Sequence, residues 1–243
     1  MRKKAQPLTA FRILAKEWAR ETNLERKISM AKALLELAYP EIVLDIFLSK
    51  LDTQSRSEIK RVVAAVDHCA FIGTSRAQAE SMNISLENIA SQEGFPSDQQ
   101  SFPSMILSRE LGSQMGIEEI PTTVFKAQGR NSRGASIGIE VFLPEMDDTI
   151  LNDWIARSIG THIALRVKTP KGIMIIQSIL LAQGFSMPAF MHNTPMENTT
   201  ERSITIYFDI PEDDQHMRLE FFYKNNFLTA RTPYVYNPYY HEA

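Results

Sequence analysis

The chain carries VDHCAFI at residues 66–72 and, 94 positions further on, GTHIALRV at residues 160–167. Both stretches are rich in residues that favour β-strands, and each has a histidine, His68 or His162, at its third position. Two similar segments at a long spacing indicate an internal repeat, and a repeat decides the fold wherever it is present.

Each of these stretches is followed by a second β-rich run that carries one glutamate among mainly apolar residues. The first run is IGIEVFL at residues 137–143, with Glu140, and the second is RLEFFY at residues 218–223, with Glu220. The order His, Glu, His, Glu therefore consists of two copies of one pattern. It predicts a duplicated fold whose halves share a single metal site.

The intervening segments complete two units of the same order, β-α-β-β-β. In the first unit the pattern predicts strands at about residues 66–72, 104–110, 121–127 and 136–143, and a helix at about 75–91. In the second unit it predicts strands at about 162–168, 185–190, 203–209 and 217–223, and a helix at about 171–183 that stops at Gly184. The predicted fold class is α+β, with two βαβββ modules that form a curved sheet or barrel.

A helical segment precedes the first unit, because apolar residues recur at helical spacing from about residue 7 to residue 64. We therefore predict a helical N-terminal extension at 1–64 and a first module at 65–144. Residues 145–243 are predicted to hold a linker helix, the second module and a tyrosine-rich tail. The tail is expected to pack against the body of the protein or against a dimer partner.

Composition and charge narrow the class of protein. Of the 243 residues, 44% are hydrophobic and 23% are charged, and the net charge of −3 provides no basic field for nucleic acid. No run of about 18 apolar residues is present, so no membrane partner is expected, and the lack of an apolar signal core predicts a cytoplasmic location. The single cysteine, Cys69, excludes a disulfide framework and is expected to be a buried structural thiol.

Side-chain alternation along the strands places four candidate ligands on one face of the sheet. These residues are His68, Glu140, His162 and Glu220. They project away from the face that packs on the helices, and a curved sheet would let them converge. Arg166 lies on the same face as His162 and is a candidate for binding a substrate carboxylate, although a salt bridge at the rim explains it equally well.

Two imidazoles and two carboxylates form a ligand set that suits divalent ions of the first transition row. Mixed nitrogen and oxygen ligands favour Ni²⁺, Zn²⁺, Fe²⁺, Co²⁺ or Mn²⁺ over Ca²⁺ or Mg²⁺. Burial of two glutamates without partners would be costly, and coordination of a metal ion offsets that cost. The residue types do not select among these metals.

The doubled pattern resembles the vicinal oxygen chelate superfamily, which includes glyoxalase I, the bleomycin resistance proteins and the extradiol dioxygenases. The resemblance covers residues 66–223, about two thirds of the chain, and the pattern of glyoxalase I is the most similar. It implies that His68, Glu140, His162 and Glu220 bind the metal ion. It also implies a lyase or isomerase whose small substrate chelates the metal through adjacent oxygens, with Glu140 or Glu220 as general base.

Two other functions stay open at this point. Dioxygenases of the same superfamily, including the hydroxyglutarate synthase type, use an Fe²⁺ site with two histidines and one glutamate. That set would correspond to His68, His162 and Glu220, with Glu140 as a neighbour rather than a ligand. The other open function is that of a metal-free binding or interaction protein of the same fold. The expected partners are a small-molecule substrate and, in some members, a second copy in a homodimer.

Overall fold

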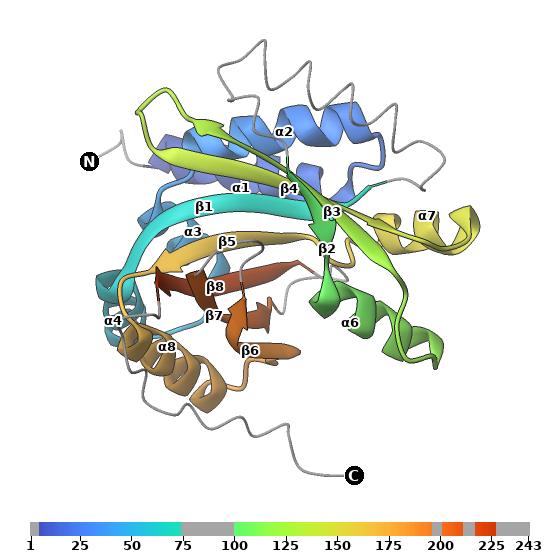
Figure 1. Cartoon of the computed structure of the whole chain (residues 1–243). Coiled ribbons are helices and arrows are strands. Elements are labelled where there is room, and N and C mark those ends of the chain that lie inside the picture. Colours follow the sequence, from blue (N-terminus) through green and yellow to red (C-terminus); the bar gives the residue numbers. More distant parts are fainter. Residues whose placement is uncertain (1–4, 74–99, 196–200, 211–216, 227–243) are drawn as a thin grey trace.

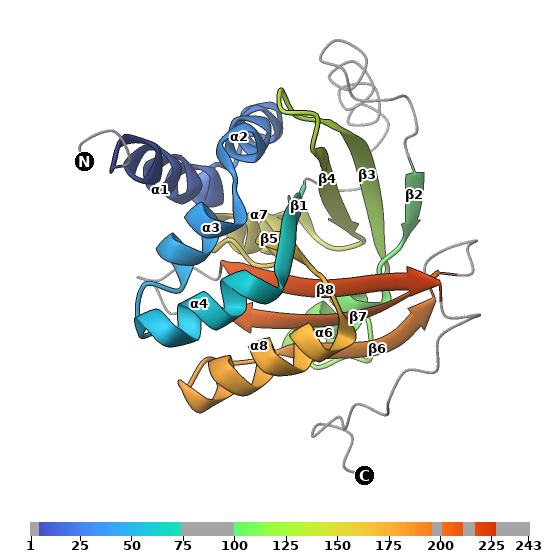
Figure 2. The same ribbon diagram turned by 90° about the vertical axis from the view of Figure 1, so that its left-hand side faces the viewer.

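The structure, a computed structural model, describes residues 5–73, 100–195, 201–210 and 217–226. Within these ranges the strands form one strongly curved sheet of eight strands, in the order β2-β3-β4-β1-β5-β8-β7-β6 (Figures 1 and 2). The predicted helix at 75–91 and the tyrosine-rich tail lie outside the described residues.

The sheet consists of two halves with the same internal order. The strands are β1 (Val63–Ile72), β2 (Gln100–Pro103), β3 (Thr122–Arg130), β4 (Ser136–Pro144), β5 (His162–Val167), β6 (Ala189–Pro195), β7 (Glu201–Asp209) and β8 (Arg218–Asn226). In each half the first strand pairs in parallel with the last, as β1 does with β4 and β5 with β8, and the other neighbours are antiparallel. The halves join where β1 and β5 pair antiparallel. The α+β class and the curved sheet are confirmed.

Helices cover both faces of the sheet to different extents. They are α1 (Ala5–Arg20), α2 (Leu24–Leu37), α3 (Pro40–Phe47), α4 (Thr53–Val62), α6 (Met105–Met115), α7 (Asp148–Ala156) and α8 (Pro170–Ala182). Three of the N-terminal helices begin at residues that favour the start of a helix. The side chain of Asn23 caps α2, that of Asp52 caps α4, and Pro40 opens α3. The predicted helical extension is thereby confirmed.

The convex face of the sheet holds the larger core. Helices α2, α3 and α4 contact β1, while α8 contacts β5, β7 and β8 (Figure 2). Trp18 of α1 meets Phe71 of β1 edge to face, with ring centroids 6.0 Å apart. Cys69 points into the same core and is free and buried, as predicted. The N-terminal helices therefore pack against the convex face of the sheet.

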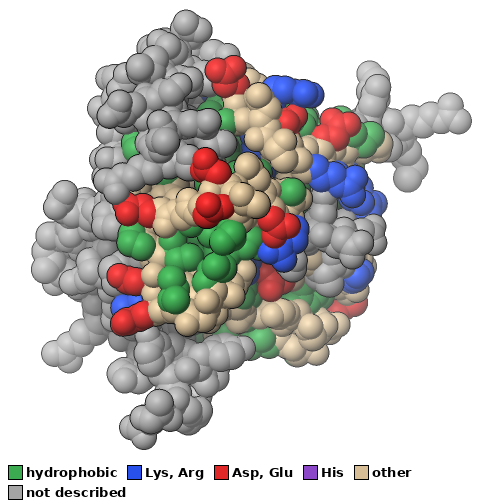
Figure 3. Space-filling view, turned by 90° about the vertical axis from the view of Figure 1, so that its right-hand side faces the viewer, with side chains coloured by type: hydrophobic (Ala, Val, Ile, Leu, Met, Phe, Trp, Pro, Cys, Tyr) green, Lys and Arg blue, Asp and Glu red, His purple; other side chains and the backbone are tan. Residues whose placement is uncertain are grey.

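A smaller apolar cluster fills one end of the concave face. It is formed by α6, α7 and the inward-facing residues of the neighbouring strands, and includes Ile72, Phe142, Leu111 and Trp154. Among the residues that the structure describes, this end of the molecule carries exposed hydrophobic side chains among charged ones (Figure 3).

One predicted strand is wrong. Residues 104–110 begin the helix α6, because the side chain of Ser104 accepts a hydrogen bond from the backbone N–H of Leu107 and caps it. The strand of this unit is instead β2, at Gln100–Pro103. A short apolar run such as SMILSREL has no period that separates a strand from a helix. Strand β6 also begins later than the predicted 185–190.

Other boundaries agree with the prediction to within a few residues. Helix α8 stops before Gly184, whose φ of 78° is the left-handed conformation common just after a helix end. The linker helix is α7, which the side chain of Asp147 caps. No helix among the described residues has both the length and the apolar character that crossing a bilayer demands.

Candidate metal centre

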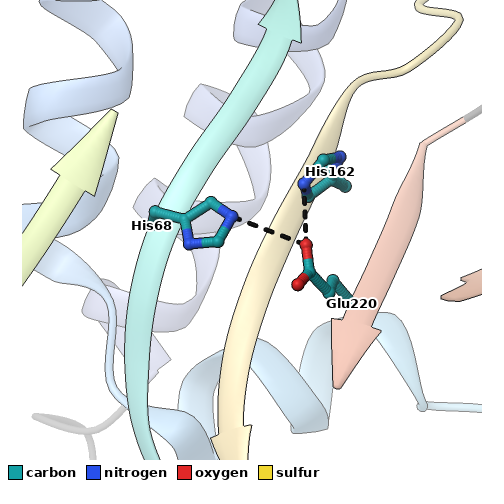
Figure 4. Close-up of side chains that lie close together, drawn as sticks. All are labelled: His68, His162 and Glu220. Atoms are coloured by element: carbon teal, nitrogen blue, oxygen red, sulfur yellow. Dashed lines mark ion pairs between the residues drawn. The ribbon is translucent and has the colours of Figure 1, made fainter. Parts of the chain in front are cut away.

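Three adjacent strands bring His68, His162 and Glu220 together on the concave face. They lie on β1, β5 and β8, and their side chains point toward one another (Figure 4). In the register of the sheet, Ala164 of β5 pairs with His68 on one side and with Glu220 on the other. The side chain between them is therefore only a methyl group. All three residues are buried, with 4%, 4% and 7% of their surface exposed.

The ligand atoms of these three residues lie within 4.8 Å of one another, and they are the only such group of three or more among the described residues. Oε2 of Glu220 is 3.0 Å from Nε2 of His162 and 3.5 Å from Nε2 of His68. Two atoms that are each about 2.1 Å from one ion lie about 3.0 Å apart at a right angle and about 3.4 Å apart in a tetrahedron. The separations of the Glu220 oxygen from the two imidazole nitrogens therefore fit a shared divalent ion.

The imidazole of His68 is oriented by the preceding residue, Asp67. Neighbouring strand residues normally face opposite ways, but β1 has a bulge here. Val66 pairs with Leu165 while His68 pairs with Ala164, so β1 advances by two residues where β5 advances by one. Oδ2 of Asp67 is consequently 3.1 Å from Nδ1 of His68. A carboxylate oxygen only accepts, so Nδ1 carries the hydrogen and Nε2 faces the cluster.

The imidazole of His162 is oriented by backbone. Its Nδ1 is 3.0 Å from the carbonyl oxygen of Gly160, so Nδ1 again donates and Nε2 faces the cluster. Gly160 has a φ of 72°, and a Cβ at this position would be 3.1 Å from Cγ1 of Ile72. Glycine is therefore required by both the backbone conformation and the packing.

Both Nε2 atoms are buried without a hydrogen-bond partner among the described residues. The Glu220 oxygen is near enough for an ion pair with each, but neither contact has hydrogen-bond alignment. A buried polar atom without a partner calls for an explanation. Metal-binding histidines commonly donate their other ring N–H to a carboxylate or carbonyl, as both do here. The two Nε2 atoms without partners are thus placed where they could hold a metal ion.

Glu140 is near this group but has a different partner. Its Oε2 is 3.6 Å from Nε2 of His68, while its Oε1 is 2.5 Å from Nζ of Lys126. Lys126 lies directly opposite Glu140 in the register of β3 and β4, and both side chains are nearly buried. The structure therefore places Glu140 in an ion pair at the edge of the cluster.

Glu220 has a neutral partner at the corresponding place. Tyr207 of β7 lies opposite Glu220 in the register, and its hydroxyl interacts with that carboxylate. Burial, together with the nearby charges of Glu220 and Glu140, raises the pKa of Tyr207 well above its ordinary value, so the hydroxyl stays protonated and neutral. The ring of Tyr207 also meets His162 edge to face, with centroids 5.5 Å apart.

The charges of the site are strongly coupled. Burial by itself lowers the pKa of His68, but Glu140, Asp67 and Glu220 outweigh it and raise that pKa to about 10. Burial by itself raises the pKa of Glu220, but the two imidazoles facing it hold that pKa far below its usual range. With neutral imidazoles, the three carboxylates and Lys126 leave two negative charges, which a divalent cation would balance.

Arg166 lies at the opposite end of the concave face from α6 and α7. It is exposed on β5, and its charge contributes to the lowered pKa of Asp67. No ion pair of Arg166 is found among the described residues, so the structure supports neither a rim salt bridge nor a bound substrate by itself. Its role stays a prediction.

Arg218 forms ion pairs at the end of the concave face where α6 lies. Its guanidinium binds Glu110 of α6 through both terminal nitrogens, at 2.5 and 2.8 Å, and binds Asp209 of β7 at 2.7 Å. A cavity of about 160 Å³ beside it is lined by Gln114, Arg157, Ile159 and Arg218, and contains none of the candidate ligands. Arg218 therefore joins the two halves across this end.

Three residues that shape the site were missed from the sequence: Asp67, Lys126 and Tyr207. Simple alternation turns Asp67 away from His68, and only the bulge brings it round. Lys126 and Tyr207 do face inward by alternation within their strands. Their pairing with Glu140 and Glu220 depends on register, which a single sequence does not specify.

No model of a protein family matches the chain, and no curated protein matches it. Several solved structures resemble it in fold. Methylmalonyl-CoA epimerase from Streptomyces coelicolor is 13% identical, over 66% of this chain and 97% of its own, with a TM-score of 0.38. The same enzyme from Mycobacterium tuberculosis is 14% identical, over 67% and 89%, with a TM-score of 0.40.

A 4-hydroxymandelate synthase variant from Streptomyces coelicolor is 12% identical, over 66% of this chain and 48% of its own, with a TM-score of 0.40. These neighbours are members of the vicinal oxygen chelate superfamily, the one that the sequence resembles. The likeness concerns the fold alone.

Proposed function

We propose that this protein is a metal-dependent enzyme with three protein ligands, His68, His162 and Glu220, that acts on a small substrate with adjacent oxygen atoms. One observation carries the proposal. These three residues alone among those described bring ligand atoms within 4.8 Å of one another, while Glu140 is paired with Lys126. Of the functions considered from the sequence, the two-histidine, one-carboxylate site of the dioxygenase type agrees best with this arrangement.

A divalent ion bound there would supply Lewis acidity and, in the case of Fe²⁺, reactivity toward O₂. The protein residues have separate tasks. Asp67 and the carbonyl of Gly160 fix the two imidazoles, and Tyr207 fixes the carboxylate of Glu220. Three protein ligands leave coordination positions of the ion open for substrate oxygens.

The substrate is proposed to enter from the end of the concave face where Arg166 lies. The opposite end is filled by the apolar cluster of α6 and α7 and closed by the Arg218–Glu110 pair. Phe222, beside the ring of His68 at 6.1 Å between centroids, lies in register with Arg166 and gives this end an apolar wall. An anionic group on the substrate would pair with Arg166.

A lyase or isomerase with four protein ligands is the second candidate, and the 3.6 Å distance from Glu140 to Nε2 of His68 favours it. In that mechanism Glu140 or Glu220 would be the general base. Burial alone raises the pKa of Glu140, but His68 and Lys126 outweigh it and lower that pKa, so the carboxylate is ionised and able to accept a proton. The two candidates differ in whether Glu140 binds the metal.

The test begins with elemental analysis of protein purified without chelator or histidine tag, where about one equivalent of Fe, Ni, Zn, Co or Mn is expected. Glu140→Gln and Glu220→Gln are then compared by Co²⁺ titration. The two carboxylates lie 3.6 and 3.5 Å from the same Nε2, so each substitution removes one charge at nearly the same distance. The visible spectrum of bound Co²⁺ depends on the atoms that coordinate it, so a change in the spectrum distinguishes loss of a ligand from loss of a nearby charge.

We expect Glu220→Gln to lower Co²⁺ affinity at least a hundredfold and to change the visible spectrum of bound Co²⁺. Glu140→Gln should lower the affinity about tenfold or less and leave the spectrum as in the wild type. Equal losses and equal spectral changes would favour the four-ligand enzyme. If the wild type binds none of these metals, the chain is instead a metal-free binding protein.

A further inference from the structure

The two carboxylates of the concave face differ in the residue opposite each of them. The register pairs Glu140 with Lys126 and Glu220 with Tyr207, at corresponding places in the two halves. Each half carries one histidine and one glutamate, but the residue that stands opposite the glutamate differs between the halves. A cation stands against one of them and a neutral hydroxyl against the other.

The contact between Lys126 and Glu140 is a close, largely dry ion pair. Nζ is 2.5 Å from Oε1, and the side chains are 13% and 12% exposed. An ion pair removed from water in this way is costly to break, because either partner alone would be a buried charge without compensation. Lys126 thus both neutralises Glu140 and holds one of its oxygens away from the cluster.

We infer that Lys126 is a positioning residue that sets the number of protein ligands at three by retaining Glu140 in this ion pair. The inference rests on the proposed metal site and specifies what keeps a fourth ligand out. Without the ammonium, a buried carboxylate would remain 3.6 Å from Nε2 of His68, and the metal ion would be its strongest available partner. A fourth protein ligand would then take a position otherwise open to the substrate.

Lys126→Met is the decisive variant, because methionine keeps most of the length of the side chain and removes its charge. Co²⁺ alone is the probe, and both affinity and visible spectrum are recorded. We expect at least tenfold tighter Co²⁺ binding and a changed spectrum, reflecting an added carboxylate ligand. The double variant Lys126→Met, Glu140→Gln removes one positive and one negative charge, so it keeps the net charge of the site and should restore the wild-type spectrum and affinity.

Lys126→Arg is the conservative control. Arginine retains the charge and can hold Glu140, so the wild-type spectrum is expected. If Lys126→Met does not fold, Lys126→Gln takes its place, with folding checked by circular dichroism. A purely electrostatic effect of Lys126 would tighten Co²⁺ binding without changing the spectrum, and that result would overturn the inference.

Failure of this inference is distinguishable from failure of the proposed function. If wild-type protein binds Co²⁺ and loses it in Glu220→Gln, the metal site stands whatever Lys126 does. An unchanged spectrum in Lys126→Met would then refute the role of Lys126 alone. If neither wild type nor variant binds Co²⁺, the metal site itself is refuted.

Discussion

The first half of the sheet supplies one histidine and one glutamate to the concave face, and so does the second half, yet their surroundings differ. In the first half, a carboxylate supports His68 and a lysine holds Glu140. In the second half, a backbone carbonyl supports His162 and a tyrosine supports Glu220. The two copies of the pattern thus place their histidines and glutamates in different surroundings, because the residues that contact these side chains are not duplicated.

The convex face shows a similar inequality. Behind the first half, α2 buries Lys27 against β1, with Nζ 5.5 Å from the centroid of Phe71 and 3.4 Å from the carbonyl oxygen of Ala19. Behind the second half, the residues that α8 buries are glycine, isoleucine and leucine. The first half therefore carries a buried charge in its supporting core, and the second half has no counterpart on α8.

Removal of that buried charge should have the largest effect on stability. Burial lowers the pKa of Lys27 from 10.5 to about 8, which corresponds to roughly 3 kcal/mol of destabilisation at pH 7. The unfolded chain binds more protons than the folded one between pH 8 and 10.5, so wild-type stability should rise with pH in that window. Lys27→Met should be more stable at pH 7 by roughly 3 kcal/mol and should lack this rise.

Urea unfolding at pH 7 and at pH 9.5 measures the effect, with Lys171→Met, at an exposed position in the first turn of α8, as the matched control. A Lys27→Met protein no more stable than wild type at pH 7 would mean that the ammonium is well compensated.

The apparent affinity for metal ions should depend on pH because of His68, which lies in the first half of the sheet. The raised pKa of His68, about 10, means that Nε2 must lose a proton before it can bind a metal ion. Apparent affinity should therefore rise about tenfold per pH unit, or about a hundredfold between pH 6.5 and 8.5. An ordinary histidine would give only about a twofold rise over that range.

Calorimetric titration with Co²⁺ at pH 8, in two buffers of different ionisation enthalpy, counts the protons released. Close to one proton per metal ion is expected. Release of less than about a fifth of a proton would show that His68 titrates normally.

Removal of the carboxylate that contacts Nδ1 of His68 should weaken metal binding, whereas a change of the residue that precedes His162 should not. Asp67→Asn is expected to lower Co²⁺ affinity about 10- to 100-fold, the usual range for an outer partner of a metal ligand. Thr161 precedes His162 as Asp67 precedes His68, but its hydroxyl has no partner among the described residues. Thr161→Val should therefore leave affinity within about twofold. Equal losses in the two variants would contradict the asymmetry between the halves.

The backbone support of His162 can be tested at Gly160. Gly160→Ala combines a left-handed φ with a Cβ 3.1 Å from Ile72, so a loss of roughly 1–2 kcal/mol of stability is expected. Gly184→Ala has a similar φ and no atom within 4 Å, which isolates the backbone strain. Thermal unfolding should rank Gly160→Ala below Gly184→Ala, and only the former should also lower Co²⁺ affinity.

Sequence periodicity predicted most of this fold because the signals are local. Alternation in IGIEVFL and helical spacing before residue 64 reflect which side chains are buried, and burial dominates the choice of structure. The same signals failed at residues 104–110, where a single capping serine selected a helix. They also gave no reason to turn Asp67 toward His68, because a bulge is a property of the pairing between two strands.

The sequence by itself determined most of the strands and helices along the chain, the face on which His68, His162, Glu140 and Glu220 lie, and the burial of Cys69. Those features follow from side-chain period and hydrophobicity within single elements. Only the tertiary structure decided that Lys126 stands against Glu140 while Tyr207 stands against Glu220, and that three residues rather than four converge. Register and sheet curvature join residues up to 152 positions apart, from His68 to Glu220, and no local pattern encodes such a distance.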